Sequence, residues 1–338
     1  MTASVIPALH GVLTEEQLLA SVRAIAEMQQ PDGLILWTPG GHADPWNHVE
    51  TAMALDVGGM HGEASRAYQW LANNQRADGS WFQYYLAHGI EDAKFDANTI
   101  SYVATGVWHH HLAAAQSGFL EEMWTVVERA IDWVLELQQP GGEILWARQP
   151  NGEPFAYALL TGSSSIAHSI GSALQIAKAV GKDRPDWVQA RGNLAAAIMD
   201  HPELFEPKQR WAMDWYYPVL AGVLRGEPAV ERLRAAWDRF VISGEGVRCV
   251  DDHPWVTTGE TAECAIACMA AGRRDDAVAL MRWSSHLRHE DGSYWTGLHI
   301  PDRVHFPAGE RTAYSAAAVV LAVDAIAGSG PAASVFRH

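Results

Sequence analysis

Two acidic residues near expected helix starts, Asp44 and Glu260, have the character of a paired acid and base. Glu260 lies in the segment 255–263, where a threonine precedes it and a second acid follows three residues later, so both acids face the same side. Burial beside Trp255 would raise the pKa of Glu260 and suit it to donate a proton at neutral pH. Asp44 stands before Pro45 as a helix N-cap, where the helix dipole would lower its pKa and keep it ionised. One protonated and one ionised carboxyl is the arrangement that glycoside hydrolysis needs.

Other polar and aromatic residues could bind a sugar around this pair. Carboxylates, histidines and an arginine can bond hydroxyl groups, and flat aromatic rings can stack on sugar faces. Each also has a structural alternative, because acids cap helices, tryptophans pack between helices and histidines fill buried polar positions. Asp96 is the next candidate for the general base after Asp44, but it would cap the following helix equally well. The candidate substrate-binding residues are Trp46, His48, Glu50, Asp96, Asp214, Trp215, Tyr216, Arg248, Trp255, Glu263, Trp295 and His305.

A metal site is a weaker alternative. Cys249, Asp251, Asp252 and His253 lie close together and could suggest zinc, but their spacing fits zinc poorly. The sequence contains no phosphate loop, dinucleotide fingerprint or Gly-x-Ser-x-Gly elbow. We therefore expect neither a metal nor an organic cofactor.

A short recurring phrase organises the elements that must position these residues. Glutamine, or once His-Glu, is followed by Asp-Gly or Gly-Gly and then by tryptophan. Clear copies occupy 29–37, 75–81, 138–146 and 289–295, and degenerate copies occupy 207–211 and 243–246. About six copies, mostly about 40 to 65 residues apart, indicate a repeat architecture.

Helix pairs are expected between these phrases, and strand signals are weak. Apolar residues at three-and-four spacing, together with caps and terminal glycines, mark the helices. Six hairpins with no polar end caps predict an all-α fold closed into an (α/α)6 toroid rather than an open solenoid. The expected helices are 15–29, 44–55, 63–73, 99–115, 120–137, 164–180, 187–199, 215–224, 229–240, 258–271, 275–286 and 312–326.

One set of helices is rich in Ala, Gly and Ser and should form the inner ring. The N-termini of inner helices would then meet at one end, where their dipoles converge and a pocket is expected. Aligning the inner helices by their terminal glycines places Glu50, Tyr217 and Glu263 at one level. Asp214 and Glu260 then lie one turn nearer the N-terminus.

Composition narrows the functional class. A net charge of -16 disfavours binding to nucleic acid and to anionic membrane surfaces. Three cysteines without CxxC spacing suggest a reducing compartment, and neither a secretion signal nor a membrane-spanning stretch is evident. We expect one cytoplasmic domain over residues 1–338, and homodimer formation is left open.

The turn phrases resemble the repeat of the prenyltransferase and squalene-cyclase superfamily of (α/α)6 toroids. The blocks 44–50, 213–218 and 310–312 resemble an actinobacterial branch often labelled prenyltransferase. The Asp-x-Asp-Asp motif of terpene cyclases is missing, and Cys249-Val250-Asp251 reverses the Asp-x-Cys order of zinc prenyltransferases. Within this branch the chain is similar to the mycobacterial methylmannose polysaccharide hydrolases, which are endo-acting α-mannosidases. That resemblance implies Asp44 and Glu260 as the catalytic pair.

The sequence therefore predicts an inverting glycoside hydrolase that acts on an intracellular, α-linked polysaccharide. The resemblance implies that this substrate is an α-1,4-linked mannose chain that carries methyl groups. Glu260 would be the general acid and Asp44 the general base. Two alternatives stay open: a zinc- or magnesium-dependent prenyl-transfer enzyme of the same fold, and a toroid that binds carbohydrate without cutting it.

Overall fold

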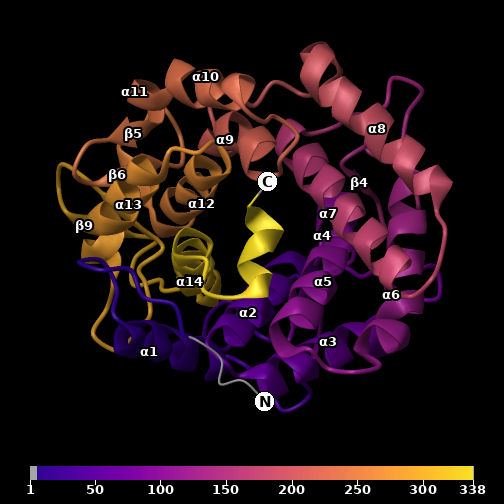
Figure 1. The fold of residues 1–338 in the computed structure, drawn as a ribbon, viewed down its shortest axis with the longest axis horizontal. Coiled ribbons are helices and arrows are strands. Elements are labelled where there is room, and N and C mark those ends of the chain that lie inside the picture. Colours follow the sequence, from indigo (N-terminus) through magenta and orange to yellow (C-terminus); the bar gives the residue numbers. More distant parts are fainter. Residues whose placement is uncertain (1–5, 338) are drawn as a thin grey trace.

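The chain forms two concentric rings of helices (Figure 1). This is a computed structural model, and it describes residues 6–337. The inner ring consists of α2 (Pro45–Val57), α4 (Ala97–Ser101) continued by α5 (Val103–Ala114), α7 (Leu160–Ala179), α9 (Ala212–Leu220), α12 (Thr258–Ala270) and α14 (Ala313–Ala327). The outer ring consists of α1 (Glu15–Ala26), α3 (His61–Asn74), α6 (Phe119–Leu135), α8 (Pro185–Asp200), α10 (Glu227–Ala235) with the short α11 (Trp237–Phe240), and α13 (Arg274–Trp283).

Outer and inner helices alternate along the chain, and the ring closes on itself. The last inner helix, α14, packs against α12 on one side and α2 on the other, and α1 lies outside it. The predicted (α/α)6 toroid is confirmed. Its helix boundaries differ mainly at α7, which begins four residues before the expected 164–180, and at α9, which covers 212–220 instead of 215–224. Two expected helices are each divided, 99–115 into α4 and α5 and 229–240 into α10 and α11.

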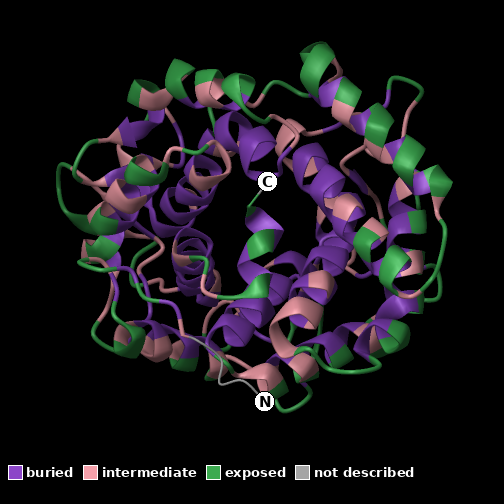
Figure 2. Ribbon diagram, in the orientation of Figure 1, coloured by how far each residue is buried: buried purple, intermediate pink, exposed green. Residues whose placement is uncertain are grey.

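Small residues identify the inner ring, as predicted. All of α14 is buried except Tyr314 and Ala327, and its alanines allow neighbouring helices to approach closely. The outer helices show the opposite pattern, with one buried and one exposed face (Figure 2). The amphipathic α6 is an example, because its apolar residues recur at helical spacing toward the ring.

The repeated turn phrases join consecutive outer helices. Nε2 of Gln75 donates to the carbonyl oxygen of Gly79 in its own turn, at 3.0 Å, and to that of Val126 in α6, at 2.8 Å. Gln29 and Gln138 make equivalent pairs of bonds to α3 and α8. Each copy is therefore a clasp between neighbouring hairpins, which explains why the phrase recurs.

A glycine at each clasp allows the turn to touch the next helix. Gly79 has a φ of +97°, and an added Cβ would lie 2.4 Å from the carbonyl oxygen of Arg129. We expect Gly79→Ala to lower the free energy of unfolding by about 2 to 4 kcal/mol, because it combines left-handed backbone strain with a backbone clash. Gly118→Ala is the control, since Gly118 has a φ of +81° but nothing within 4 Å of an added Cβ. Equal losses in denaturant unfolding would show that the clasp contact is unimportant.

Short β-strands lie at one end of the ring, and the sequence analysis did not predict them. β1 (Tyr84–Leu86) pairs with β2 (Gly89–Asp92), and β3 (Phe95–Asp96) pairs with β4 (Ala147–Arg148). A five-stranded antiparallel sheet follows in the order β5 (Val241–Ile242), β6 (Gly246–Arg248), β7 (Trp255–Thr257), β8 (Gly297–His299) and β9 (Val304–Phe306). This sheet contains the degenerate phrase at 243–246 and contacts α12.

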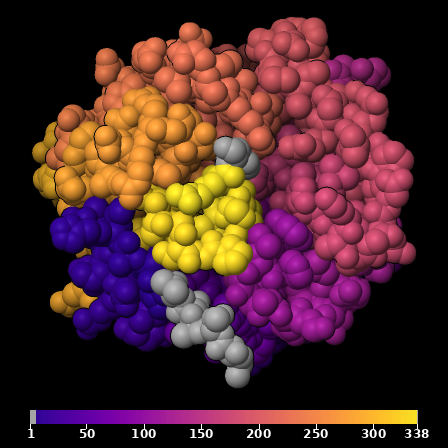
Figure 3. Space-filling model, in the orientation of Figure 1, coloured from indigo at the N-terminus to yellow at the C-terminus, as the bar shows by residue number. Residues whose placement is uncertain are grey.

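The C-terminal segment closes the other end of the ring. A 3-10 turn at Pro331–Phe336 lies near the axis, and Figure 3 shows it filling the centre of this face. The Phe336 ring stacks on His168 of α7, with 5.5 Å between ring centroids. The interior is therefore approached from the opposite end, where the inner helices begin. Short turns at Pro202–Leu204 and Ser284–Leu287 complete the fold, and no helix within residues 6–337 is long and apolar enough to cross a membrane.

Candidate active site at the mouth of the helical ring

Four acidic residues occupy the N-terminal ends of inner helices. Asp44 and Asp96 are the N-caps of α2 and α4, and Asp214 and Glu260 lie in the first turns of α9 and α12. Because the inner helices run in the same direction, these ends share one face of the ring, which we call the mouth. The helix dipoles favour negative charge there. The expected convergence of acids that are distant in the sequence is present.

Asp44 is held by four donors. Its Oδ1 accepts the backbone N–H groups of Trp46 and Asn47, at 2.8 and 3.0 Å. Its Oδ2 accepts the indole N–H of Trp37 at 2.9 Å and the amide of Asn47 at 2.6 Å. Nevertheless, burial raises the pKa of Asp44 above its ordinary value, because only 3% of the residue is exposed and the donors offset only part of this effect. The prediction of a lowered pKa is therefore wrong, since it considered the helix terminus without the burial.

Glu260 has the environment of a general acid. Burial is the largest effect on its carboxyl and raises the pKa, as predicted, while a hydrogen bond from Thr257 opposes the rise. The Thr257 hydroxyl donates to Oε2. A hydrogen bond from the backbone N–H of Glu260 itself also opposes the rise in pKa. The residue is partly exposed at the mouth.

One inner helix, α14, lies between the helices that carry Asp44 and Glu260. Tyr314 of α14 packs against Trp46 beside Asp44, with 5.3 Å between ring centroids. Its hydroxyl donates to Oε1 of Glu263 at 2.9 Å, and Glu263 lies one turn below Glu260 in α12. Asp44 and Glu260 are therefore on the same rim, on inner helices separated only by α14.

A layer of acids and tyrosines forms the floor below the mouth. Tyr102 donates to Glu50, and the hydroxyls of Tyr216, Tyr217 and Tyr314 donate to Glu263. Glu50, Tyr217 and Glu263 border one small axial cavity, so the level deduced from the terminal glycines is confirmed. The sequence analysis did not identify Tyr102, which joins α4 to α5, or Tyr314, in the first turn of α14, as part of this layer.

The floor makes stability depend on pH. Burial raises the pKa of Glu50 from 4.5 to about 8, with a further contribution from Glu263. Between these values the folded state retains a proton that the unfolded state has lost, so the free energy of unfolding falls as pH rises, by up to about 1.4 kcal/mol per pH unit.

We expect Glu50→Gln to flatten this fall between about pH 5 and 8, because the amide does not titrate. Denaturant unfolding at four pH values would test it, with Glu121→Gln on the exposed face of α6 as the control. A Glu50→Gln slope equal to that of the wild type would contradict the assignment.

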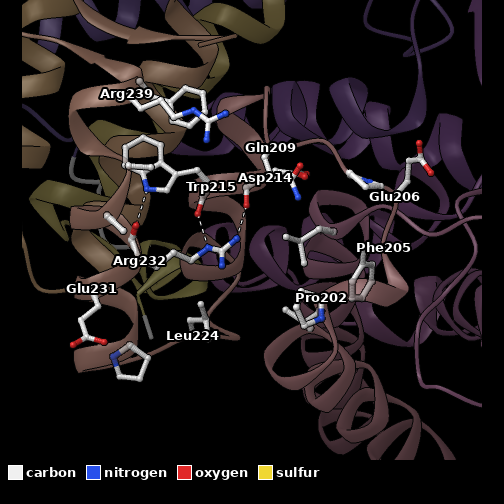
Figure 4. A pocket seen from close by; sticks show the side chains of 17 residues that line it. Pro202, Phe205, Glu206, Gln209, Asp214, Trp215, Leu224, Glu231, Arg232 and Arg239 are labelled. Atoms are coloured by element: carbon white, nitrogen blue, oxygen red, sulfur yellow. Dashed lines mark hydrogen bonds between the residues drawn. The ribbon is translucent and has the colours of Figure 1, made fainter. Parts of the chain in front are cut away.

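A proline in α9 determines how Asp214 is held. Pro218 has no N–H to donate to the carbonyl of Asp214 four residues earlier. The guanidinium of Arg232 in α10 replaces that donor, with Nη2 at 2.7 Å from this carbonyl oxygen and Nε at 2.8 Å from that of Trp215 (Figure 4). The Asp214 carboxylate accepts from Thr161 of α7 at 2.7 Å.

Four predicted binding residues gather on or beside the five-stranded sheet next to α12. Trp255 lies on β7, Arg248 on β6 and His305 on β9, and Trp295 precedes β8. The Trp295 and His305 rings stack at a centroid distance of 4.1 Å. The sequence indicated these residues individually, whereas the sheet that brings them together was not predicted.

Three residues that were predicted to bind sugar beside the catalytic pair have other roles in the structure, so their predicted role at the mouth is corrected. His48 is fully buried, with its ring bonded to the backbone of Ile35 and Ala67. Trp215 points away from the mouth toward α10 and stacks on Phe240, and the Tyr216 hydroxyl is engaged by Glu263. Sequence spacing placed these residues on the correct helices but could not show which way their side chains point.

Asp96 resembles Asp44. It caps α4 through the N–H groups of Asn98 and Thr99, and the Trp146 indole donates to its Oδ2. Burial raises its pKa to about 6. The two residues therefore form a matched pair of capping carboxylates on adjacent inner helices.

Three of the four residues considered as zinc ligands make other contacts in the structure. Asp251 and Asp252 form ion pairs with Arg239 and Arg210, and the His253 ring stacks on Trp255. In the region from residue 6 to residue 337, no group of three or more His, Cys, Asp or Glu side chains could hold a metal ion.

Comparison with solved structures identifies the structural class of this fold. A solved wild-type glycosidase has a TM-score of 0.72 at 15% identity, and the match covers 93% of this chain and 98% of that one. Cellobiose 2-epimerase from Spirochaeta thermophila has a TM-score of 0.70 at 14% identity, covering 93% of this chain and 96% of its own. The fold is therefore that of the helical toroids found among carbohydrate enzymes.

Comparison with known protein sequences is more specific than the comparison of folds, because it identifies the family. The chain is 49% identical over 332 residues to the MMP endo-(1,4)-3-O-methyl-alpha-D-mannosidase of Mycolicibacterium hassiacum, covering 98% of this chain and 92% of that protein. This protein belongs to the same family. It is also 24% identical over 139 residues to an uncharacterized glycosyl hydrolase of Methanocaldococcus jannaschii, covering 37% of this chain and 22% of that protein. The chain matches no family model.

Proposed function

We propose that this protein is an endo-acting α-mannosidase that cuts a 1,4-linked mannose chain carrying 3-O-methyl groups. The observation that carries the proposal is the 49% identity to a mannosidase of that specificity along nearly the whole length of both chains. The mouth supports it independently, because carboxyls from four inner helices and the aromatic residues of the sheet surround one rim.

In the proposed reaction, Glu260 transfers its proton to the glycosidic oxygen as the bond between this oxygen and the anomeric carbon breaks. Asp44 removes a proton from a water molecule that attacks the same carbon from the opposite face, so the configuration inverts. Asp44 then returns its proton to solvent and Glu260 is reprotonated. We expect the two carboxyls to lie about 6.5 to 9.5 Å apart around bound substrate, which leaves room for the water.

The remaining site residues have supporting roles in this proposal. Trp46, Trp255 and Trp295 provide aromatic surface, and Asp96 and Asp214 bond sugar hydroxyls. The proposed steps use no metal or organic cofactor. We propose that the ring acts as one catalytic domain in the cytoplasm, an assignment supported by the net charge of -16 and by three free cysteines.

The test is incubation with a purified, 3-O-methylated α-1,4-mannooligosaccharide of defined length. We expect mass spectrometry to detect internal fragments, and proton NMR at early times to show a new β-configured reducing end. Release of single terminal sugars alone would contradict endo action, and an initial α-anomer would contradict inversion. No fragments after prolonged incubation with active-site-titrated protein would contradict the hydrolase assignment.

A further inference from the structure

A cavity of about 600 Å³ opens on the side of the ring, between the outer helices α8 and α10. It lies where the turn phrase is degenerate, because the copy at 207–211 has no Asp-Gly or Gly-Gly pair. The glutamine and glycine clasp that joins α3 to α6 and α6 to α8 is therefore replaced here by an open space. We call this cavity the seam pocket.

The seam pocket begins at the mouth. Leu160, the first residue of α7, and Asp214, in the first turn of α9, both line it. These helix starts belong to the rim that carries Asp44 and Glu260. Asp214 therefore borders both the candidate active site and the seam pocket, and a chain leaving the mouth between α7 and α9 would enter this space.

The walls of the seam pocket are mainly apolar. Pro202 and Phe205 lie on one side, and Trp215 and Leu224 face them across the open space in Figure 4. The polar and charged side chains among them are Glu206, Gln209, Asp214, Glu231, Arg232 and Arg239. Pockets of about 300 to 1,000 Å³ with apolar walls and few polar groups are typical of sites for small organic ligands.

This lining fits a sugar chain whose hydroxyls are partly capped. A 3-O-methyl group presents carbon to an apolar wall, while the remaining hydroxyls can reach the few polar groups. A free hydroxyl turned toward the apolar part of the wall would exchange contact with water for contact with carbon, which is unfavourable. The walls would therefore distinguish methylated from unmethylated units.

We propose that the seam pocket is a subsite for the 3-O-methylated sugar units that extend from the cleavage point. The proposal rests on the proposed function for the identity of the chain. In this proposal the seam pocket selects methylated substrate, and the carboxyls at the mouth cleave the glycosidic bond.

The test narrows the seam pocket without altering the mouth. Ala235, on the exposed side of α10, lines the seam pocket, and Ala235→Trp would partly fill it. The matched control is Ala196→Trp, because Ala196 is exposed on α8 and does not line the seam pocket. Pro228→Trp narrows the seam pocket from the start of α10 and serves as a second variant should Ala235→Trp fold poorly.

We expect Ala235→Trp to lower kcat/KM on a 3-O-methylated α-1,4-mannooligosaccharide by about 10-fold or more, mainly through KM. On the unmethylated oligosaccharide of equal length it should match Ala196→Trp. Equal losses on both substrates, or no loss on either, would overturn the proposal.

Binding separates failure of this proposal from failure of the proposed function. Calorimetry with the methylated oligosaccharide would use the Glu260→Gln protein, alone and combined with Ala235→Trp or Ala196→Trp. One outcome is that the wild type shows no cleavage while Ala235→Trp, unlike Ala196→Trp, weakens binding. In that case the subsite stands and the hydrolase assignment fails. If the wild type cleaves and Ala235→Trp changes neither binding nor kcat/KM, the subsite fails and the hydrolase assignment stands.

Discussion

Replacing Glu260 by glutamine should lower kcat on the mannooligosaccharide by about 10² to 10⁴, the range expected for loss of a general acid. The amide has nearly the same shape and can still accept from Thr257, but it has no acidic proton to transfer. Folding should change little, because the residue is partly exposed at the mouth and the hydrogen bond is retained.

The pH profile and the leaving group identify the acid. Burial raises the pKa of Glu260, so wild-type activity should fall as pH rises through that pKa and the proton is lost. This alkaline limb should disappear in Glu260→Gln. A dinitrophenyl α-mannooligosaccharide, whose leaving group needs no proton, should be cleaved by the variant at a rate much closer to that of the wild type.

The control for this prediction is Glu263→Gln, one turn below on the same helix. Glu263 is fully engaged by three tyrosine hydroxyls in the floor, so its substitution should perturb the floor without removing the proton donor. A larger loss of kcat in Glu263→Gln, with the dinitrophenyl substrate rescuing only that variant, would transfer the acid role to Glu263.

The features predicted best from the sequence are those that depend on local pattern. Asp44 before Pro45 begins α2 as expected, and the alanine-rich segment of α14 lies in the inner ring. The recurring phrase indicated the repeat because its glutamine copies at 29–37, 75–81 and 138–146 all make the same clasp. These properties follow from residues close together in the chain.

The features that were missed depend on contacts between distant segments. The five-stranded sheet consists of strands of two or three residues, which are too short to show alternation in the sequence. The His48 ring is bonded to the backbone of Ile35 and Ala67, and the backbone carbonyl of Asp214 accepts from Arg232. The helix patterns around His48 and Asp214 do not indicate these partners. The pKa of Asp44 was mispredicted for the same reason, since its burial comes from other elements.

Replacing Asp44 by alanine should cause a loss of activity of a size comparable to that of Glu260→Gln, because the attacking water would have no base. It should also destabilise the protein by about 0.5 to 2 kcal/mol, since the α2 N-cap is lost. Stability alone therefore cannot distinguish a catalytic base from a capping residue, and a matched cap is needed.

Asp96→Ala provides that matched cap. Asp96 also caps an inner helix through two backbone N–H groups and also accepts from a tryptophan indole, so its loss should cost similar stability. If Asp44 is the base, kcat should fall much further in Asp44→Ala than in Asp96→Ala, measured at a temperature where both variants are folded. Azide, small enough to occupy the space vacated in Asp44→Ala, should restore turnover with a β-mannosyl azide as product, because it attacks the face opposite the departing oxygen. Equal losses of kcat in the two variants, without azide products, would mean that Asp44 only caps α2 and that the water is activated by another carboxylate of the mouth.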